Sequence, residues 1–244
     1  TVGTADVVLM SGLQFEGFME RLIEVSNTDA TVVVLSNGAE LLPSTGEGHS
    51  TDADATAESD GHDEESEGEF DPHAWQSVRN AQVYVRSIAD AFCAADADGC
   101  DTYRAKAQAY VAQLDALEDE IKAGVDEVPE EKRTIITSHD AFGYFARAYG
   151  INFLAPEGVS TESEASAADV AALIRQARED KASAIFVENI TNPRLIEQIA
   201  SETGLRVGGT LYSDALSDES GPAATYIDMM RHNITTIKRA IFGS

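Results

Sequence analysis

The sequence is poor in positive charge and contains no long apolar segment. Of its 244 residues, 17 are Lys or Arg and 43 are Asp or Glu, which gives a formal net charge of -26. This balance excludes a generic nucleic-acid-binding protein, which needs a basic face, and disfavours binding to anionic membranes. No apolar run approaches the roughly 18 residues that cross a bilayer, so direct membrane insertion is not expected. Because 43% of the residues are hydrophobic, we expect a globular core under an acidic surface.

Cysteine is also scarce, with only Cys93 and Cys100 present. The two lie where one helical pattern ends and the next begins. Metal-binding cysteine pairs usually have two intervening residues and a second pair elsewhere, and neither feature is present. We interpret the pair as a disulfide bond at a helix–helix corner, which is typical of an oxidising compartment. Two reduced, partly buried thiols are the alternative.

The chain begins abruptly, because residues 7–10 already read as a buried strand. We therefore expect an upstream part, with a signal peptide that is not present in this chain, to precede residue 1.

Short apolar runs alternate with amphipathic helical patterns in two stretches, and a long helical pattern over residues 101–125 separates them. Such alternation predicts parallel sheets. We expect an α/β fold of two lobes with parallel sheets, joined by a long rigid helix. The predicted divisions are an N-terminal α/β lobe at 1–97, incomplete at its start, a linking helix at 98–128 and a C-terminal α/β lobe at 129–244.

The hydrophobic periodicity predicts individual elements. Strands are expected at 7–10, 31–35, 134–137, 151–154, 184–187 and 206–209, and helices at 15–25, 75–92, 101–125, 142–149, 166–180, 193–203 and 222–241. Ser166 fits a helix N-cap with Asp169 three residues later, and Pro193 fits the first position of its helix.

An acidic segment interrupts the N-terminal lobe at residues 44–71. From 47 to 71 it carries eleven acidic residues and no Lys or Arg. Its composition predicts a mobile loop, because too little apolar surface is available to offset the entropy of ordering. The loop contains His49 and His62, which could serve as accessory metal-capture residues. The alternative, to which we give equal weight, is that the segment is a solvated run of charges with no role in metal capture.

Three residues form a candidate metal site. His139 directly follows a predicted strand, Asp214 follows the last predicted strand, and His73 stands between the acidic loop and a helix. Ligands in parallel α/β folds bind beyond the carboxyl ends of strands. Two imidazoles and a carboxylate suit a divalent cation such as Zn²⁺. His232 lies within a helical pattern without a matching acid, so we interpret it as a helix-surface residue.

Four segments together resemble the zinc- and manganese-specific solute-binding proteins of ABC transporters, the cluster A-I family. The Asp-Pro-His and Ser-His-Asp-Ala-Phe motifs are the most specific parts of this resemblance. The resembling segments lie in family order at Ala5–Glu16, Asp71–Trp75, Ser138–Phe145 and Tyr212–Leu216.

The resemblance implies that His73, His139 and Asp214 are metal ligands, and that a histidine at 139 favours zinc, since manganese members tend to have glutamate there. It implies a periplasmic, monomeric protein that captures Zn²⁺ in a cleft between the lobes and delivers it to an ABC permease. A periplasmic zinc metallochaperone is a further candidate partner. The family takes another histidine from a region upstream of Ala5. The fourth ligand would come from there, or be His49, His62 or water.

Two other functions compete with this one. The first is an enzyme, because the order of His73, the His139–Asp140 pair and Asp214 also fits HD-like metal-dependent phosphohydrolases. The second is a surface adhesin of the same fold, because relatives of the family include such proteins. Glu188, at the end of a predicted strand, could be a general base or could orient a histidine. The strand before His139 disagrees with the helical HD fold, so we expect a binding protein and no enzyme.

Overall fold

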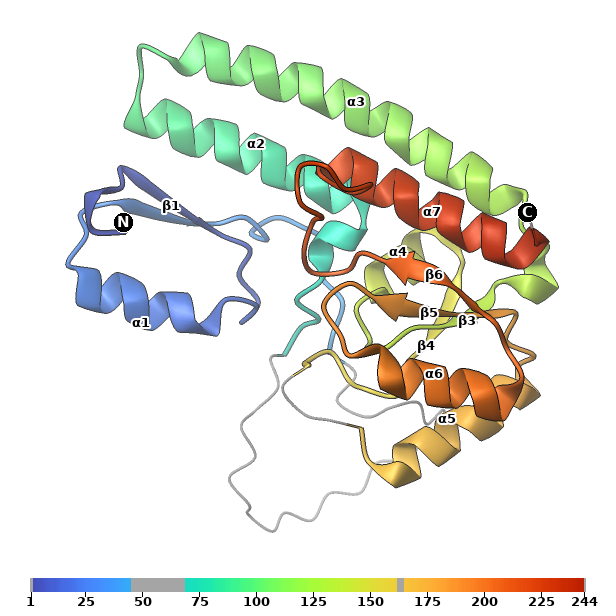
Figure 1. Ribbon diagram of the computed structural model, residues 1–244. Coiled ribbons are helices and arrows are strands. Elements are labelled where there is room, and N and C mark those ends of the chain that lie inside the picture. Colours follow the sequence, from blue (N-terminus) through green and yellow to red (C-terminus); the bar gives the residue numbers. More distant parts are fainter. Residues whose placement is uncertain (1, 45–68, 162–164, 244) are drawn as a thin grey trace, which may run out of the picture.

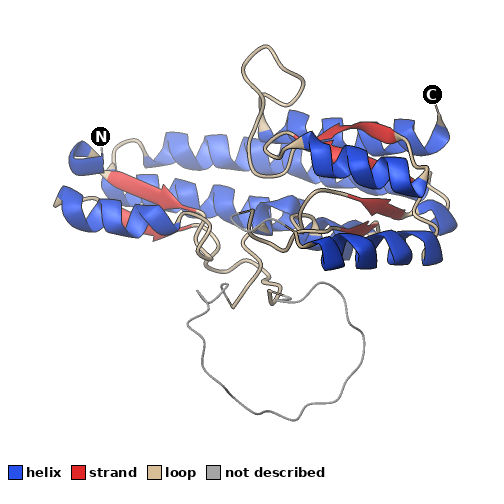
Figure 2. Cartoon of the chain, turned by 60° about the horizontal axis from the view of Figure 1, so that its bottom comes forward, coloured by secondary structure: helices blue, strands red, loops and turns tan. Residues whose placement is uncertain are grey.

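Two parallel β-sheets form the framework of the molecule, which a computed structural model describes for residues 2–44, 69–161 and 165–243. The smaller sheet pairs β1 with β2, and the larger has the order β4-β3-β5-β6. The two sheets lie toward opposite ends of an elongated arrangement (Figures 1 and 2). The strands are β1 (Val7–Met10), β2 (Thr31–Val34), β3 (Thr134–Ile136), β4 (Asn152–Leu154), β5 (Ala184–Glu188) and β6 (Val207–Leu211).

One long helix connects the two ends. Helix α3 (Cys100–Asp126) has 27 residues, and at 1.5 Å per residue it is about 40 Å long. It packs against α2 (Val78–Ala95) along its first part and against α7 (Tyr226–Phe242) along its second (Figure 1). The expected α/β fold with a long connecting helix is therefore confirmed. The lobe boundaries at residues 97 and 128 stay a prediction.

The remaining helices cover the sheets. The described residues contain no helix with the length and apolar character that a bilayer span requires. At α5, Ser166 and Asp169 form the predicted capping box, and Pro193 begins α6 as expected. These elements are α1 (Gly17–Ser26), α4 (Gly143–Tyr149), α5 (Ala167–Glu179) and α6 (Pro193–Thr203), with short 3-10 turns η1 (Val2–Thr4), η2 (Ala74–Gln76) and η3 (Glu130–Lys132).

The core holds the larger sheet in place from both faces. Leu114, Leu117 and Ile121, spaced three and four residues apart in α3, are fully buried and belong to a cluster that includes residues of α4, β3 and α7. A second cluster lies between the sheet and helices α5 and α6. Helices thus cover both faces of the parallel sheet, which leaves the loops at the carboxyl ends of its strands as the place for a ligand.

The first predicted helix begins two residues later than expected. Leu13 and Gln14 adopt positive φ angles of 57° and 63°, which cannot continue into a right-handed helix. The Glu16 carboxylate accepts the backbone N–H groups of Ser11 and Gly12 and stabilises this turn. The prediction that the helix starts at residue 15 was therefore wrong.

Two other helix starts also differ from prediction. The segment predicted as one helix from residue 75 is the turn η2 followed by α2. The last helix was expected to begin at Pro222, but Thr225 is its N-cap and accepts the N–H of Asp228. At α7 the helix start is set by Thr225, whose side-chain oxygen satisfies a free N–H group, and not by Pro222.

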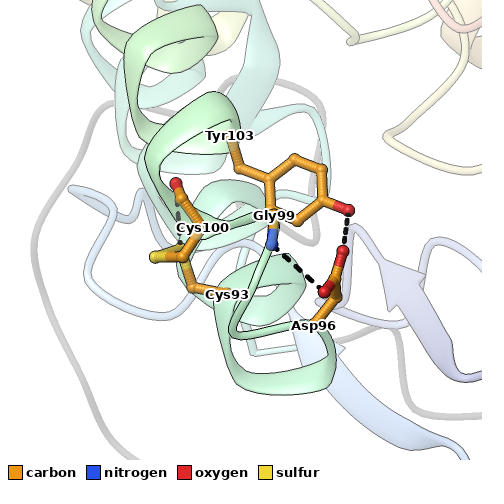
Figure 3. The surroundings of a disulfide bond; sticks show 5 residues. All are labelled: Cys93, Asp96, Gly99, Cys100 and Tyr103. Carbon is orange, nitrogen blue, oxygen red and sulfur yellow. Dashed lines mark hydrogen bonds between the residues drawn. A yellow bond between two sulfur atoms is a disulfide. The ribbon is translucent and has the colours of Figure 1, made fainter.

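Cys93 and Cys100 form a disulfide bond between α2 and α3, which confirms the prediction. Figure 3 shows the corner that the bond closes. Asp96 stabilises the same corner, because its carboxylate accepts the N–H of Gly99 at 3.1 Å and the hydroxyl of Tyr103 at 2.7 Å.

Removing this disulfide should lower stability without changing the fold. Closing so short a loop contributes about 2.5 kcal/mol in the chain-entropy model. For a protein of this size, the double variant Cys93→Ala/Cys100→Ala should therefore melt about 5–10 °C lower. Thermal unfolding monitored by circular dichroism measures the shift. An unchanged melting temperature would show that the bridge contributes no net stability.

Candidate metal centre

Three side chains that are distant in sequence converge on one point. His73, His139 and Asp214 each offer a ligand atom, and these atoms all lie within 4.8 Å of one another. The two imidazoles are buried, and the Asp214 side chain is 14% exposed. His49 and His62 lie outside the described residues. His232 lies half-buried in α7, with Nε2 2.9 Å from the carbonyl oxygen of Thr210, and is not part of this cluster.

The order of strands explains the convergence. Strands β3, β5 and β6 are neighbours in the larger sheet, and their carboxyl ends meet at one edge. His139 follows β3, Glu188 is the last residue of β5, and Asp214 follows β6. His73 precedes η2 and approaches from the segment that leads into α2.

The imidazole of His73 lies between two carboxylates. Its Nδ1 is 2.8 Å from Oδ1 of Asp71, and its Nε2 is 3.3 Å from Oδ1 of Asp214. The same Asp71 oxygen accepts the backbone N–H of His73 at 2.9 Å. A carboxylate beside Nδ1 favours the tautomer with the proton on that nitrogen, which leaves the Nε2 lone pair available to a metal.

His139 has a matching environment. Its Nδ1 is 2.8 Å from Oε2 of Glu188, a close contact that is not aligned as a hydrogen bond, and its Nε2 is 3.3 Å from Oδ2 of Asp214. The other oxygen of Glu188 accepts the backbone N–H groups of Ser138 at 2.8 Å and His139 at 3.0 Å. Glu188 therefore orients both the ring and the loop that carries it.

The electrostatics of the site favour positive charge. Burial lowers the pKa of His139, but the nearby carboxylates of Asp214 and Glu188 outweigh it and raise the pKa to about 10. Burial also opposes the charged form of His73, yet Asp214 and Asp71 raise its pKa above the ordinary value. Burial raises the pKa of Asp214, and the two histidines reverse this and hold it well below its usual range. The cluster thus attracts protons or other cations.

The nitrogen–oxygen spacing between each imidazole and Asp214 matches the spacing of two ligands of a tetrahedral ion. Two ligand atoms about 2.0–2.1 Å from Zn²⁺ at a tetrahedral angle are about 3.3 Å apart. Each imidazole Nε2 lies 3.3 Å from an oxygen of Asp214. Nε2 of His139 and Oδ1 of Asp214 are also buried without an aligned hydrogen-bond partner. A bound cation would satisfy both atoms.

Aromatic rings enclose one side of the site. Phe15 and Trp75 both contact the His73 ring edge-on, with centroid distances of 6.3 Å and 5.4 Å. The two imidazoles themselves are 5.3 Å apart between centroids. An apolar surround lowers the local dielectric and strengthens any charge interaction at the site.

Asp71 was not predicted to have a role, and two roles remained open for Glu188. Asp71 stands two residues before His73, so its short spacing from a candidate ligand was the available signal. Its backbone carbonyl accepts the hydroxyl of Tyr144 at 2.9 Å. Gly143 packs beneath it, where an added Cβ would come 2.8 Å from Asp71 Oδ2. The orienting role of Glu188 is the one that the contacts support.

Comparison with known proteins gives a consistent picture. Residues 1–240 match the family model of ZnuA, described as zinc-uptake complex component A, periplasmic. The manganese-binding lipoprotein MntA of Halalkalibacterium halodurans is 34% identical over 235 residues, which cover 96% of this chain and 71% of that protein. The iron-binding protein YfeA of Yersinia pestis is 31% identical over 240 residues, covering 98% and 71%.

A zinc-binding relative is similar in both sequence and structure. The zinc-binding protein TroA of Treponema pallidum is 33% identical over 245 residues, which cover 98% of this chain and 74% of that protein. The solved structure of periplasmic TroA superposes with a TM-score of 0.83, covering 98% of this chain and 82% of that chain at 31% identity. The names of these relatives include three different metals.

Proposed function

Since this chain belongs to the ZnuA family of substrate-binding proteins of metal ABC transporters, we propose that it captures Zn²⁺ between His73, His139 and Asp214 and delivers it to a membrane permease. The ion is cargo, and the convergence of three donor atoms within 4.8 Å is the observation that carries the proposal. A tetrahedral site has a fourth position, which water or another side chain would occupy.

The chain is a solute-binding protein and not an enzyme, as its family and relatives indicate. The HD-like phosphohydrolase alternative is wrong, because His139 follows a strand of a parallel sheet. Oε1 of Glu188 accepts the backbone N–H groups of Ser138 and His139, and Oε2 lies 2.8 Å from Nδ1 of the His139 ring. These contacts favour an orienting role for Glu188 over that of a general base.

The choice of zinc over other metals rests on the donor set. Two imidazole nitrogens and one carboxylate suit Zn²⁺, whereas Mn²⁺ prefers more oxygen ligands. The relatives named for manganese and iron make these two ions the direct competitors. Competitive titration of the apo chain with Zn²⁺, Mn²⁺ and Fe²⁺ against a chromophoric chelator would rank them. Tighter binding of Mn²⁺ than of Zn²⁺ would overturn the zinc assignment.

An extracytoplasmic location agrees with relatives that are lipoproteins or periplasmic proteins. The Cys93–Cys100 disulfide supports the same location, since such bonds persist in oxidising compartments. We propose specifically the periplasm, a monomeric state and an encounter with a zinc metallochaperone. Sedimentation of the zinc-loaded chain would test the monomer.

Zinc affinity should depend strongly on pH, even at pH values above the pKa of an ordinary histidine. The metal must displace a proton from a group whose pKa is raised to about 10. Protons therefore compete with the metal throughout the neutral range, and affinity rises as pH rises. One displaced proton changes the apparent dissociation constant by about tenfold per pH unit. Chelator competition between about pH 8 and 6 measures the slope, and a flat profile above about pH 6.5, the ordinary histidine pKa, would contradict it.

A further inference from the structure

The loop that carries Asp214 is hydrogen-bonded to the segment that carries His73. The carbonyl oxygen of Ser213 accepts two N–H groups, from Nε1 of Trp75 at 3.0 Å and from Nε2 of Gln76 at 3.0 Å. Gln76 and Ser213 are fully buried. The two donors follow His73 by two and three residues, and their acceptor immediately precedes Asp214.

Other contacts tie the same loop to its own lobe. Asn233 of α7 accepts the N–H of Tyr212 at 2.9 Å and donates to its carbonyl at 2.8 Å. Asn189 donates to the carbonyl of Ala215 at 3.1 Å. These anchors place Asp214 relative to the larger sheet, and hence relative to His139. They do not reach the His73 segment.

We propose that Trp75 and Gln76 are positioning residues that set the distance between Asp214 and His73, and through that distance the affinity and selectivity of the site. The inference deepens the proposed metal-binding function and rests on it. Asp214 is the most exposed of the three ligands. Without the two donors, its loop can move toward solvent and lengthen the 3.3 Å separation between its Oδ1 and Nε2 of His73.

Selectivity follows from the same geometry. A small tetrahedral ion such as Zn²⁺ requires its donors at fixed short separations, whereas Mn²⁺ accepts a larger shell of oxygen ligands that includes water. A displaced Asp214 would therefore cost more affinity for Zn²⁺ than for Mn²⁺. Loss of the positioning residues should reduce the preference for Zn²⁺, and not only the binding strength.

Gln76 can be replaced without leaving a new unpaired group. Its Oε1 is already buried without a hydrogen-bond partner, so Gln76→Leu removes an unsatisfied acceptor together with the donor. Ser213 then keeps the hydrogen bond from Trp75. A residue that acted only in folding would change the stability of the apo chain and leave the metal selectivity unchanged.

The test compares Gln76→Leu, Trp75→Phe and the double variant with the wild-type chain. Gln82→Leu is the matched control, because Gln82 lies in the neighbouring helix α2, is only partly buried, and donates to Asp115 and not to Ser213. Chelator competition gives the dissociation constants for Zn²⁺ and Mn²⁺. The visible absorption of the Co²⁺-loaded chain reports coordination geometry, since tetrahedral Co²⁺ absorbs more strongly than octahedral Co²⁺.

We expect each single variant to bind Zn²⁺ about threefold more weakly, because the remaining donor still holds the carbonyl of Ser213. The double variant has neither donor, and we expect it to bind Zn²⁺ about 20-fold more weakly. The Zn²⁺-to-Mn²⁺ preference and the Co²⁺ absorption should fall in the double variant and stay unchanged in Gln82→Leu. If the double variant does not fold, the same criteria apply to Gln76→Leu.

Two negative results are distinguishable. A wild-type chain that binds neither Zn²⁺ nor Mn²⁺ would overturn the proposed function itself. The positioning role alone would be overturned if the wild-type chain binds Zn²⁺ and a folded variant keeps the same affinity, metal preference and Co²⁺ spectrum.

Discussion

Replacing His139 with alanine should abolish tight zinc binding. The imidazole is fully buried and presents Nε2 to Asp214 at 3.3 Å, so its removal takes away one of two nitrogen donors. Loss of a residue that only orients a ligand costs about 10–100-fold in metal affinity. Loss of the ligand itself should cost more, and we expect about 1,000-fold, or about 4.1 kcal/mol.

Thermal unfolding with and without zinc measures this loss. Zinc at about 100 times its dissociation constant stabilises the wild-type chain by about 2.7 kcal/mol, and the stabilisation nearly vanishes when affinity falls about 1,000-fold. The zinc-dependent shift in melting temperature is the proper readout, because the substitution also leaves the buried Glu188 without its imidazole contact. His232→Ala is the matched control. A full shift in His139→Ala would remove His139 from the ligand set.

Glu188→Gln should weaken zinc binding by about 100-fold while the shape of the side chain is preserved. The amide oxygen can still accept the N–H groups of Ser138 and His139, which Glu188 Oε1 accepts in the wild type. The amide NH₂ would then face Nδ1 of His139 and donate to it. This favours the tautomer with the proton on Nε2, the nitrogen that must bind the metal.

A second buried glutamate provides the control for this substitution. Glu118 of α3 accepts the hydroxyl of Tyr149 at 2.6 Å and lies 2.9 Å from Nζ of Lys122. Glu118→Gln should lower stability and leave zinc affinity unchanged. Isothermal titration of both variants separates the two effects. Equal affinities for Glu188→Gln and the wild type would show that the Glu188 contact does not select the tautomer.

The candidate ligands were predictable because motif and position agreed. His139 follows an apolar β-branched run and Asp214 follows the last predicted strand, and parallel strands bring their carboxyl ends to one edge. His73 was found from its Asp-Pro-His motif and from the change in composition at the end of the acidic segment. The capping box at Ser166 and the disulfide were predictable for a similar reason, since both depend on residues close together in the chain.

Other features could not be read from local sequence. The first helix starts late because Glu16 folds back on the turn before it, and the apolar periodicity at Phe15 does not reveal that contact. Phe15 instead packs against Trp75, with ring centroids 4.7 Å apart. The hydrogen bond between Gln76 and Ser213 joins residues 137 positions apart, a separation over which no periodicity carries information.

The sequence by itself determined which chemical groups are available, how strands and helices alternate, and that two imidazoles and a carboxylate stand in loops at strand or helix ends. Those properties depend on residue type and short-range spacing, which the chain carries directly. Only the tertiary structure decided which nitrogen of each imidazole faces the shared centre, because that choice depends on Asp71 and Glu188 occupying the opposite side of each ring. It also decided how far Asp214 stands from His73, because that distance depends on packing between segments far apart in the chain.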